Sequence, residues 1–386
     1  MTRAQSNQKR MAELLSGSTP VSATAVASAV NEFFTRRATL APTTIASYRN
    51  GSDAFLQWTS VAGVVTTEAI TAKNLMDFRA WWAVRPAQAP ASGPNVGRGQ
   101  RVHTTKTRSP LTINRGLRVV RSMLNEWRII GATPKLTSDL IRDTIRFEKR
   151  HKALPHFLRL DEIRTLVDAA LAHDAAKFTL TRAEHSGSVE AGCTPRYAPI
   201  TPVVLMALLT GCRFGELAAM RWSAVSPESR EIVLSHTETK TRQGRRIDLT
   251  PTPLLAHMLA SIKQFKVGDF CLGMYAPLRR DIAEAARKRL IKKFQAPKFT
   301  WHDLRRTSGT LLTCAPGIYG GASAFLSAKR LGHSVAVAEA HYVGAVTNLD
   351  KTASTLEAVM GLSAEQFEQA AARWREYSRE HRGGLG

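Results

Sequence analysis

Apolar residues recur at helical spacing between residues 21 and 141. The clearest stripe has separations of four, three, four and three residues: Ile113, Leu117, Val120, Leu124 and Trp127. Such spacing places the apolar side chains on one face of an amphipathic helix. Similar patterns over residues 42–58 and 72–82 predict further helices, so residues 21–141 should fold as a small helical bundle. Residues 1–20 are polar and lack this period, which is typical of a flexible arm.

Two segments depart from this pattern. Residues 85–110 are rich in Pro, Ala, Ser and Gly. Because they cannot bury enough apolar surface to become ordered, we predict a long loop there. Residues 142–157 form a basic linker, and we place the boundary between two domains in it. The second domain then spans residues 158–386.

The second domain mixes helical and strand patterns. We predict helices over residues 161–172, 203–220, 278–294 and 364–380. Two β-rich runs, residues 231–235 and 245–249, flank the turn Gln243-Gly244 and should pair as an antiparallel sheet. Residues 173–200 give no clear pattern. The predicted fold class is mostly α with a small antiparallel β-sheet in the second domain, an α+β arrangement.

Net charge indicates the kind of partner. Lys and Arg number 54 and Asp and Glu 31 among 386 residues, which gives a formal net charge of +23. This excess favours a polyanionic partner. No apolar stretch approaches the ~20 residues of a membrane-spanning helix, so nucleic acid is a better candidate than a membrane. We expect a cytoplasmic, nucleoid-associated protein whose four widely spaced cysteines stay reduced.

Positive charge concentrates between residues 98 and 128. Eight cations stand there against a single acid, Glu126: Arg98, Arg101, Lys106, Arg108, Arg115, Arg118, Arg121 and Arg128. A solvated helix face is the ordinary explanation of interleaved arginines, but the imbalance favours a face that contacts phosphates. We predict that the first seven of these cations bind DNA.

Three short motifs and one tyrosine carry the candidate chemistry. They are Thr210-Gly211-Cys212-Arg213 with Glu216-Leu217, then His302-Asp303-Leu304-Arg305, then Leu331-Gly332-His333, and Tyr342 nine residues later. An isolated tyrosine hydroxyl titrates near ~10 and is a poor nucleophile at neutral pH. Arginines that bind the electrophile's charge and an imidazole that takes the proton would activate it. The set therefore indicates a tyrosine that attacks a phosphodiester.

The ordered set resembles the signature of the tyrosine recombinases, the phage integrase family. The resemblance covers residues 155–350 and extends more loosely over residues 20–130. It implies that Arg213 and Arg305 bind the non-bridging oxygens of the scissile phosphate. It also implies that Tyr342 is the nucleophile and leaves a 3′-phosphotyrosine bond.

The resemblance assigns the remaining site residues as well. His302 would help to deprotonate the tyrosine or bond to the phosphate, and His333 would supply a further hydrogen bond. Lys240 would be the general acid on the leaving 5′-oxygen, with Arg242 or Arg245 as alternative occupants of that position. The family commonly has His after its second arginine, whereas this chain has Arg306, which we place among the DNA-binding residues. No metal, ATP or other cofactor is implied.

The same resemblance implies an assembly. A core-binding (SAM-like) domain, residues 21–141, and a catalytic domain, residues 158–386, would form a two-domain C-shaped clamp on double-stranded DNA. A homotetramer would exchange strands through a Holliday junction, and accessory DNA-bending proteins are further candidate partners. The C-terminal helix would dock on a neighbouring protomer, because its region is apolar at these positions: Leu356, Val359, Met360, Leu362, Phe367 and Trp374.

Three alternatives remain open at this point. A type IB topoisomerase-like enzyme would use the same kind of tyrosine and cations for nicking and closing. A non-catalytic DNA-binding regulator could be built on the same scaffold. A metallohydrolase could use His302, His333 and His341 as ligands, and its cleavage would be abolished by EDTA.

Overall fold

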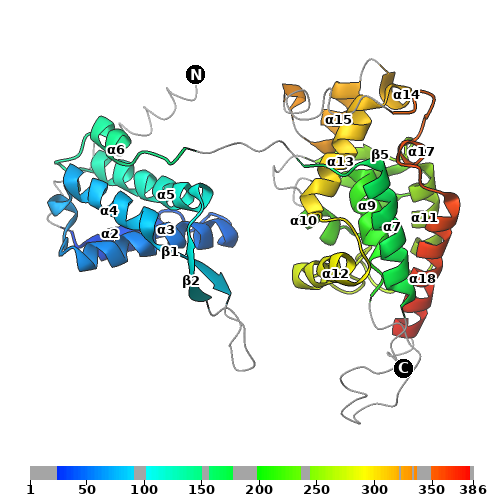
Figure 1. Ribbon diagram of the computed structural model, residues 1–386, viewed down its shortest axis with the longest axis horizontal. Coiled ribbons are helices and arrows are strands. Elements are labelled where there is room, and N and C mark those ends of the chain that lie inside the picture. Colours follow the sequence, from blue (N-terminus) through cyan, green and yellow to red (C-terminus); the bar gives the residue numbers. More distant parts are fainter. Residues whose placement is uncertain are drawn as a thin grey trace, which may run out of the picture. The chain divides into compact units, whose positions relative to one another are not determined.

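The computed structural model describes residues 24–90, 101–149, 156–176, 198–235, 244–320, 323–332, 334–336 and 349–382. The chain divides into two compact units, Met1–Ala153 and Leu154–Gly386 (Figure 1). This division falls inside residues 142–157. In the described part of the chain, no helix is both long enough and apolar enough to cross a membrane.

The N-terminal unit is a helical bundle. Its helices are α2 (Val26–Thr35), α3 (Pro42–Val61), η1 (Thr67–Ala69), α4 (Ala72–Val84), α5 (Pro110–Ile129) and α6 (Ser138–Thr144). The five residues of the predicted apolar stripe lie on α5 and are all buried, so that prediction is confirmed. Helix α3 crosses α5 closely at Gly51, where an added Cβ would lie 2.9 Å from the carbonyl oxygen of Gly116. The packed face of α5 thus positions the rest of the bundle around it.

The predicted long loop at residues 85–110 is wrong at both of its ends. Strands β1 (Pro86–Pro90) and β2 (Arg101–Thr107) pair in an antiparallel hairpin. The Thr104 hydroxyl donates to the Ala87 carbonyl at 3.0 Å. Backbone pairing orders these strands without burying much apolar surface, and the prediction had considered only apolar burial.

The C-terminal unit is mostly helical with a small sheet. Its helices are α7 (Leu160–Ala175), α9 (Thr201–Thr210), α10 (Phe214–Ala218), η2 (Trp222–Ala224), α11 (Pro253–Lys263), α12 (Arg280–Lys293), α13 (Trp301–Cys314), α14 (Pro316–Tyr319), α15 (Ser323–Leu331), α17 (Leu356–Met360) and α18 (Ala364–Arg382). The antiparallel sheet has the order β3 (Val225–Ser226), β4 (Glu231–Leu234) and β5 (Arg245–Asp248). The predicted α+β class, mostly α with a small antiparallel sheet, is confirmed.

The predicted single helix over residues 203–220 is wrong. Helix α9 is buried at all ten positions and ends at Thr210, and α10 begins only at Phe214. Gly211 separates them with φ 63°, a left-handed conformation that an L side chain rarely adopts. An added Cβ there would also collide with Leu331. The break turns the chain so that Arg213 stands at the N-cap of α10.

Helix α18 lies beside α11 and α7 of its own unit (Figure 1). The apolar residues from which we predicted docking on a neighbouring protomer all belong to the core of this unit: Leu356, Val359, Met360, Leu362, Phe367 and Trp374. Phe367 is 2% exposed and Trp374 is 3% exposed. The argument from unpartnered apolar surface was therefore wrong, because the same chain covers that surface.

Candidate active site

Arg213 is oriented by the first turn of α10. Its backbone N–H donates to Oε2 of Glu216 at 2.8 Å, and its Nη1 lies 2.9 Å from Oε1 of the same carboxylate. An acidic residue in the first turn stabilises a helix start, so Glu216 serves the fold as well as the arginine. The Arg213 side chain keeps 28% of its surface exposed.

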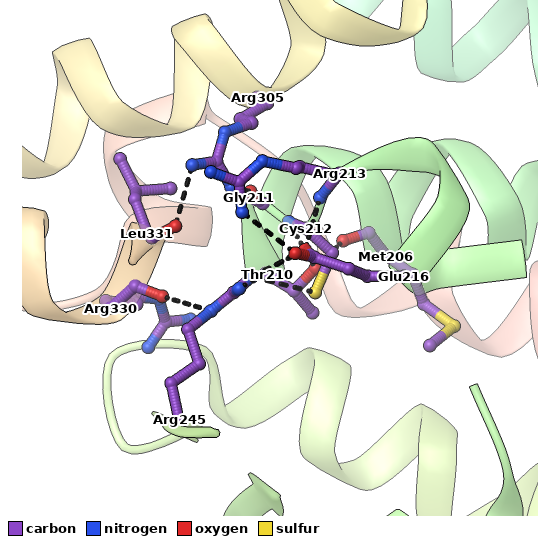
Figure 2. A network of polar contacts seen from close by, with 10 residues as sticks. All are labelled: Met206, Thr210, Gly211, Cys212, Arg213, Glu216, Arg245, Arg305, Arg330 and Leu331. Atoms are coloured by element: carbon purple, nitrogen blue, oxygen red, sulfur yellow. Dashed lines mark hydrogen bonds and ion pairs between the residues drawn. The ribbon is translucent and has the colours of Figure 1, made fainter. Parts of the chain in front are cut away.

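Arg305 ties three motif segments together. It lies on α13, which packs against α9 and α15, and it is 3% exposed. Its Nη1 donates to the carbonyl oxygen of Gly211 at 2.7 Å, and its Nη2 donates to that of Leu331 at 2.6 Å (Figure 2). The motifs of Arg213, Arg305 and Leu331-Gly332, which are far apart in sequence, therefore meet in one place.

Arg245 is the second partner of Glu216. Its Nη1 lies 3.0 Å from Oε1 and its Nη2 lies 2.7 Å from Oε2, while its Nε donates to the Arg330 carbonyl at 3.1 Å (Figure 2). The Arg245 side chain is only 7% exposed. Because its guanidinium is buried and already bound to a carboxylate, Arg245 is a poor candidate for the general acid, and Lys240 stays the prediction for that position.

The two arginines determine the charge of Glu216. Burial by itself raises the pKa of this carboxyl, but the hydrogen bonds and charges of Arg245 and Arg213 outweigh burial and lower the pKa to about 2. Glu216 is therefore an anion at any physiological pH. Burial raises the pKa of the adjacent Cys212 thiol, whose Sγ lies 3.9 Å from Nη2 of Arg245.

Arg330 completes the network from α15. Its Nη2 donates to the Leu209 carbonyl at 2.8 Å, and its Nη1 donates to the Asp248 carbonyl. These contacts hold the end of α15 against α9 and β5. Sequence reasoning missed this arginine, because no motif or charge imbalance marks it.

His302 stands one turn before two arginines on α13. Partial burial, followed by the charges of Arg306 and Arg305, lowers the pKa of its imidazole. Residues four apart on a helix lie on the same face, which brings Arg306 next to His302. The ring is therefore biased toward the neutral form, which can accept a proton.

Arg306 is held by a carboxylate. Its Nη1 lies 3.3 Å from Oδ1 of Asp303, and its side chain is 35% exposed. Asp303 also caps α13, since its Oδ2 accepts the backbone N–H of Thr300 at 2.8 Å. The predicted DNA-binding residue Arg306 thus sits at the start of α13, near His302.

Several predicted site residues lie outside the described residues: Arg98, Lys240, Arg242, His333, His341 and Tyr342. Arg101 belongs to β2, but its side chain is not among those described. In sequence, Lys240 falls between β4 and β5, and His333 and Tyr342 follow α15. Within the described ranges, no group of three or more His, Cys, Asp or Glu side chains could hold a metal ion.

The predicted DNA-binding cations of the N-terminal unit have different environments. Lys106, Arg115 and Arg118 are exposed, and Arg121 is half-buried. Arg108 is 9% exposed, with its guanidinium 3.8 Å from the centre of the Trp82 ring. Its Nε also donates to the Pro86 carbonyl at 3.3 Å. These contacts anchor the hairpin to α4, and DNA binding by Arg108 stays a prediction.

The C-terminal unit has a cationic surface on α12 to which the sequence analysis assigned no role. Helix α12 exposes four cations: Arg280, Lys288, Lys292 and Lys293. Its N-terminal end lies near the site, because the Arg280 guanidinium is 5.7 Å from the Phe214 ring on α10. The basic run over residues 278–294 was the available signal for this surface.

A helical unit and an α+β unit in which two motif arginines converge define a known class: the chain has the fold of the tyrosine recombinases. It is similar to a lambda integrase dimer bound to a COC' core site, with 17% identity over 89% of this chain and 87% of that chain and a TM-score of 0.56. A lambda integrase tetramer bound to a Holliday junction gives 15% identity over 91% and 90%, with a TM-score of 0.55.

The Tn1549 transposon integrase in complex with a circular intermediate DNA is also similar. It shares 13% identity over 85% of this chain and 97% of that chain, with a TM-score of 0.53. No protein-family model matches the sequence, and no curated protein matches it either. At these identities the likeness establishes the fold.

Proposed function

We propose that this protein is a site-specific DNA recombinase that cleaves and rejoins strands through a 3′-phosphotyrosine bond at Tyr342. One observation carries the proposal: Arg305 donates to the carbonyl oxygens of Gly211 and Leu331, which brings together the motifs of Arg213 and Arg305, 92 positions apart in sequence. Planar guanidinium groups suit the non-bridging oxygens of a phosphodiester. Leu331-Gly332 leads directly into His333 and, nine residues later, Tyr342.

The proposed reaction balances without an external cofactor. The Tyr342 hydroxyl oxygen bonds to phosphorus while the bond to the 5′-oxygen breaks. His302 takes the phenolic proton, and Lys240 gives a proton to the leaving 5′-oxygen. Arg213, Arg305 and His333 stabilise the charge on the phosphate oxygens. Attack by a 5′-hydroxyl reverses these steps, so the bond energy is conserved.

The state of His302 supports its part in this scheme. A proton acceptor must be neutral before the reaction, and burial together with two neighbouring arginines lowers the pKa of this imidazole. Arg306 contributes to that effect from its position beside Asp303. We therefore assign Arg306 an electrostatic role at the site in addition to any phosphate contact.

Double-stranded DNA is the proposed partner. The exposed cations of the N-terminal unit include Lys106, Arg115 and Arg118, and α12 presents four more on the C-terminal unit. We propose that the protein acts at the nucleoid as a homotetramer, by analogy with the lambda integrase tetramer on a Holliday junction. Accessory DNA-bending proteins would act on the same complex.

The test is covalent trapping on genomic DNA. The protein is mixed with DNA fragments, denatured and purified under conditions that retain only bonded DNA, which is then sequenced. We expect one enriched sequence for the wild type and for the control variant Tyr275→Phe, because Tyr275 is 56% exposed. Tyr342→Phe should give no adduct.

The other outcomes separate the alternatives. Adducts spread over all sequences, with relaxation of supercoiled DNA, would identify a type IB topoisomerase-like enzyme. Sequence-specific binding with no adduct would identify a non-catalytic regulator. Cleavage that requires a metal ion would identify a metallohydrolase. Each of these results would refute site-specific recombination.

A further inference from the structure

Glu216 binds two arginines with different exposure. Arg245 contacts both carboxylate oxygens through its two terminal nitrogens, at 3.0 and 2.7 Å. Arg213 contacts one of them through a terminal nitrogen, at 2.9 Å. The Arg245 side chain is 7% exposed, Glu216 is 2% exposed and Arg213 is 28% exposed. Arg213 is therefore the partner that a ligand from solvent can reach.

Charge balance gives this arrangement a consequence. If Arg213 were the sole counter-ion of Glu216, Arg213 could bind a phosphate only by leaving this carboxylate. The buried Glu216 charge would then have no partner, which is strongly unfavourable. With Arg245 present, Glu216 keeps a two-point ion pair after Arg213 turns away. Arg213 and Arg305 then offer two positive charges to one phosphodiester.

We propose that Arg245 is a positioning residue that acts as the permanent counter-ion of Glu216, which leaves Arg213 able to exchange this carboxylate for a phosphate oxygen. The inference rests on one part of the proposed function, the binding of a phosphate by Arg213. It adds to that function a residue that does not touch the substrate.

Arg245 also has a scaffolding contact, which the experiment has to separate from the charge effect. Its Nε donates to the Arg330 carbonyl at 3.1 Å, and its Cδ lies 3.0 Å from where a Cβ on Gly332 would stand. Removing the side chain disturbs both contacts. Combining Arg245→Gln with Glu216→Gln restores the charge balance but not these scaffolding contacts. This double variant therefore distinguishes the charge effect from the scaffolding effect.

The test compares Arg245→Gln, Glu216→Gln and the double variant by single-turnover cleavage of a trapped DNA substrate. Arg246→Gln is the matched control, because Arg246 is the next residue on β5 and is 75% exposed. We expect Arg245→Gln to slow cleavage about 100-fold, as loss of one transition-state donor does. The double variant should cleave at least about tenfold faster than Arg245→Gln, and the control should cleave at the wild-type rate.

A second readout does not depend on strand transfer. Inorganic phosphate is titrated into the full chain, and the side-chain Nε–H resonance of Arg213 is followed by NMR. Arg245→Gln should weaken phosphate binding and the double variant should restore it. If the wild type binds phosphate in this way but never cleaves DNA, the proposed function fails while the inference stands.

Three results would overturn the inference: a double variant as slow as Arg245→Gln, unchanged cleavage in a folded Arg245→Gln, or equal phosphate affinity in all variants. Thermal unfolding shows which variants are folded. Should Arg245→Gln unfold, Arg245→Lys replaces it, because a single ammonium keeps the charge but not the two-nitrogen contact with Glu216. It should then cleave at an intermediate rate, and a rate equal to wild type would contradict the inference.

Discussion

Gly211 gives the sharpest test of how the site is built. We predict that Gly211→Ala destabilises the C-terminal unit, because φ at this position is 63° and the new Cβ would meet Leu331 and lie 3.1 Å from Oγ of Ser308. The left-handed conformation costs roughly 1–2 kcal/mol with an L side chain. Forcing a methyl group into a packed region costs about 1–3 kcal/mol more. The expected total destabilisation is about 2–5 kcal/mol.

Gly63→Ala is the matched control. Its φ is 68°, but nothing lies within 4 Å of the added Cβ, so only the conformational cost applies. Urea unfolding should be followed by hydrogen–deuterium exchange mass spectrometry, with peptides of each unit analysed separately. Gly211→Ala should destabilise its unit by about 1–3 kcal/mol more than Gly63→Ala destabilises the N-terminal unit.

If Gly211→Ala and Gly63→Ala destabilise their units by amounts that differ by less than about 0.5 kcal/mol, this reasoning is refuted, because the collision with Leu331 would then be absent. The DNA cleavage rate of Gly211→Ala is a second measurement. The Gly211 carbonyl accepts from Nη1 of Arg305 at 2.7 Å, so a shift of this turn should also slow cleavage.

Three further predictions concern charge. Arg306→Gln should raise the pKa of His302 by removing a nearby cation, so the acid limb of the cleavage rate should move to higher pH; an unchanged limb would contradict this. Burial raises the pKa of the Glu357 carboxyl from 4.5 to about 7, so folding takes up a proton in this window and the free energy of unfolding should fall as pH rises through it. This pH-dependent loss of unfolding free energy amounts to up to about 3 kcal/mol at pH 8, and Glu357→Gln should abolish it. Urea unfolding of both proteins at pH 5 and pH 8 measures the difference. Replacing both Arg115 and Arg118 with Gln should make the slope of log binding constant against log salt concentration shallower by about 0.9 for each phosphate that the variant no longer neutralises. The control Arg142→Gln, which removes a partner of Asp139, should leave this slope unchanged.

Periodicity and motif order were sufficient for much of the molecule. The α5 stripe is buried as predicted, and α7, α12 and α18 lie where their patterns placed them. The order of the motifs also indicated that Arg213 and Arg305 belong to one site. The first kind of prediction depends on local spacing, which the sequence displays directly, and the second depends on the resemblance of the ordered motifs to a known family.

The features that the sequence did not show have a different physical origin. The break at Gly211 depends on a left-handed turn packed against Leu331, a residue 120 positions away in the chain. Arg108 reads as a cation in sequence, but Trp82 and the Pro86 carbonyl take up its guanidinium. Tertiary contacts decide such cases, and apolar spacing does not report them.

The role of Arg245 has the same origin. In sequence it stood close to Lys240 and could have taken its place, whereas the fold buries it against Glu216 from another motif. The pairing crosses 29 positions of chain. The apolar residues between Leu356 and Trp374 likewise indicated a docking surface, but they belong to the core of their own unit.

The most direct test of the central claim is peptide mapping of the covalent protein–DNA adduct. A nicked substrate traps the adduct, nuclease and protease trim it, and mass spectrometry locates the remaining nucleotide. We predict a 3′-phosphate linked to Tyr342 and a free 5′-hydroxyl on the released strand. A nucleotide on any other residue, or a 5′-phosphate linkage, would contradict the proposal that Arg213 and Arg305 present a phosphodiester to Tyr342.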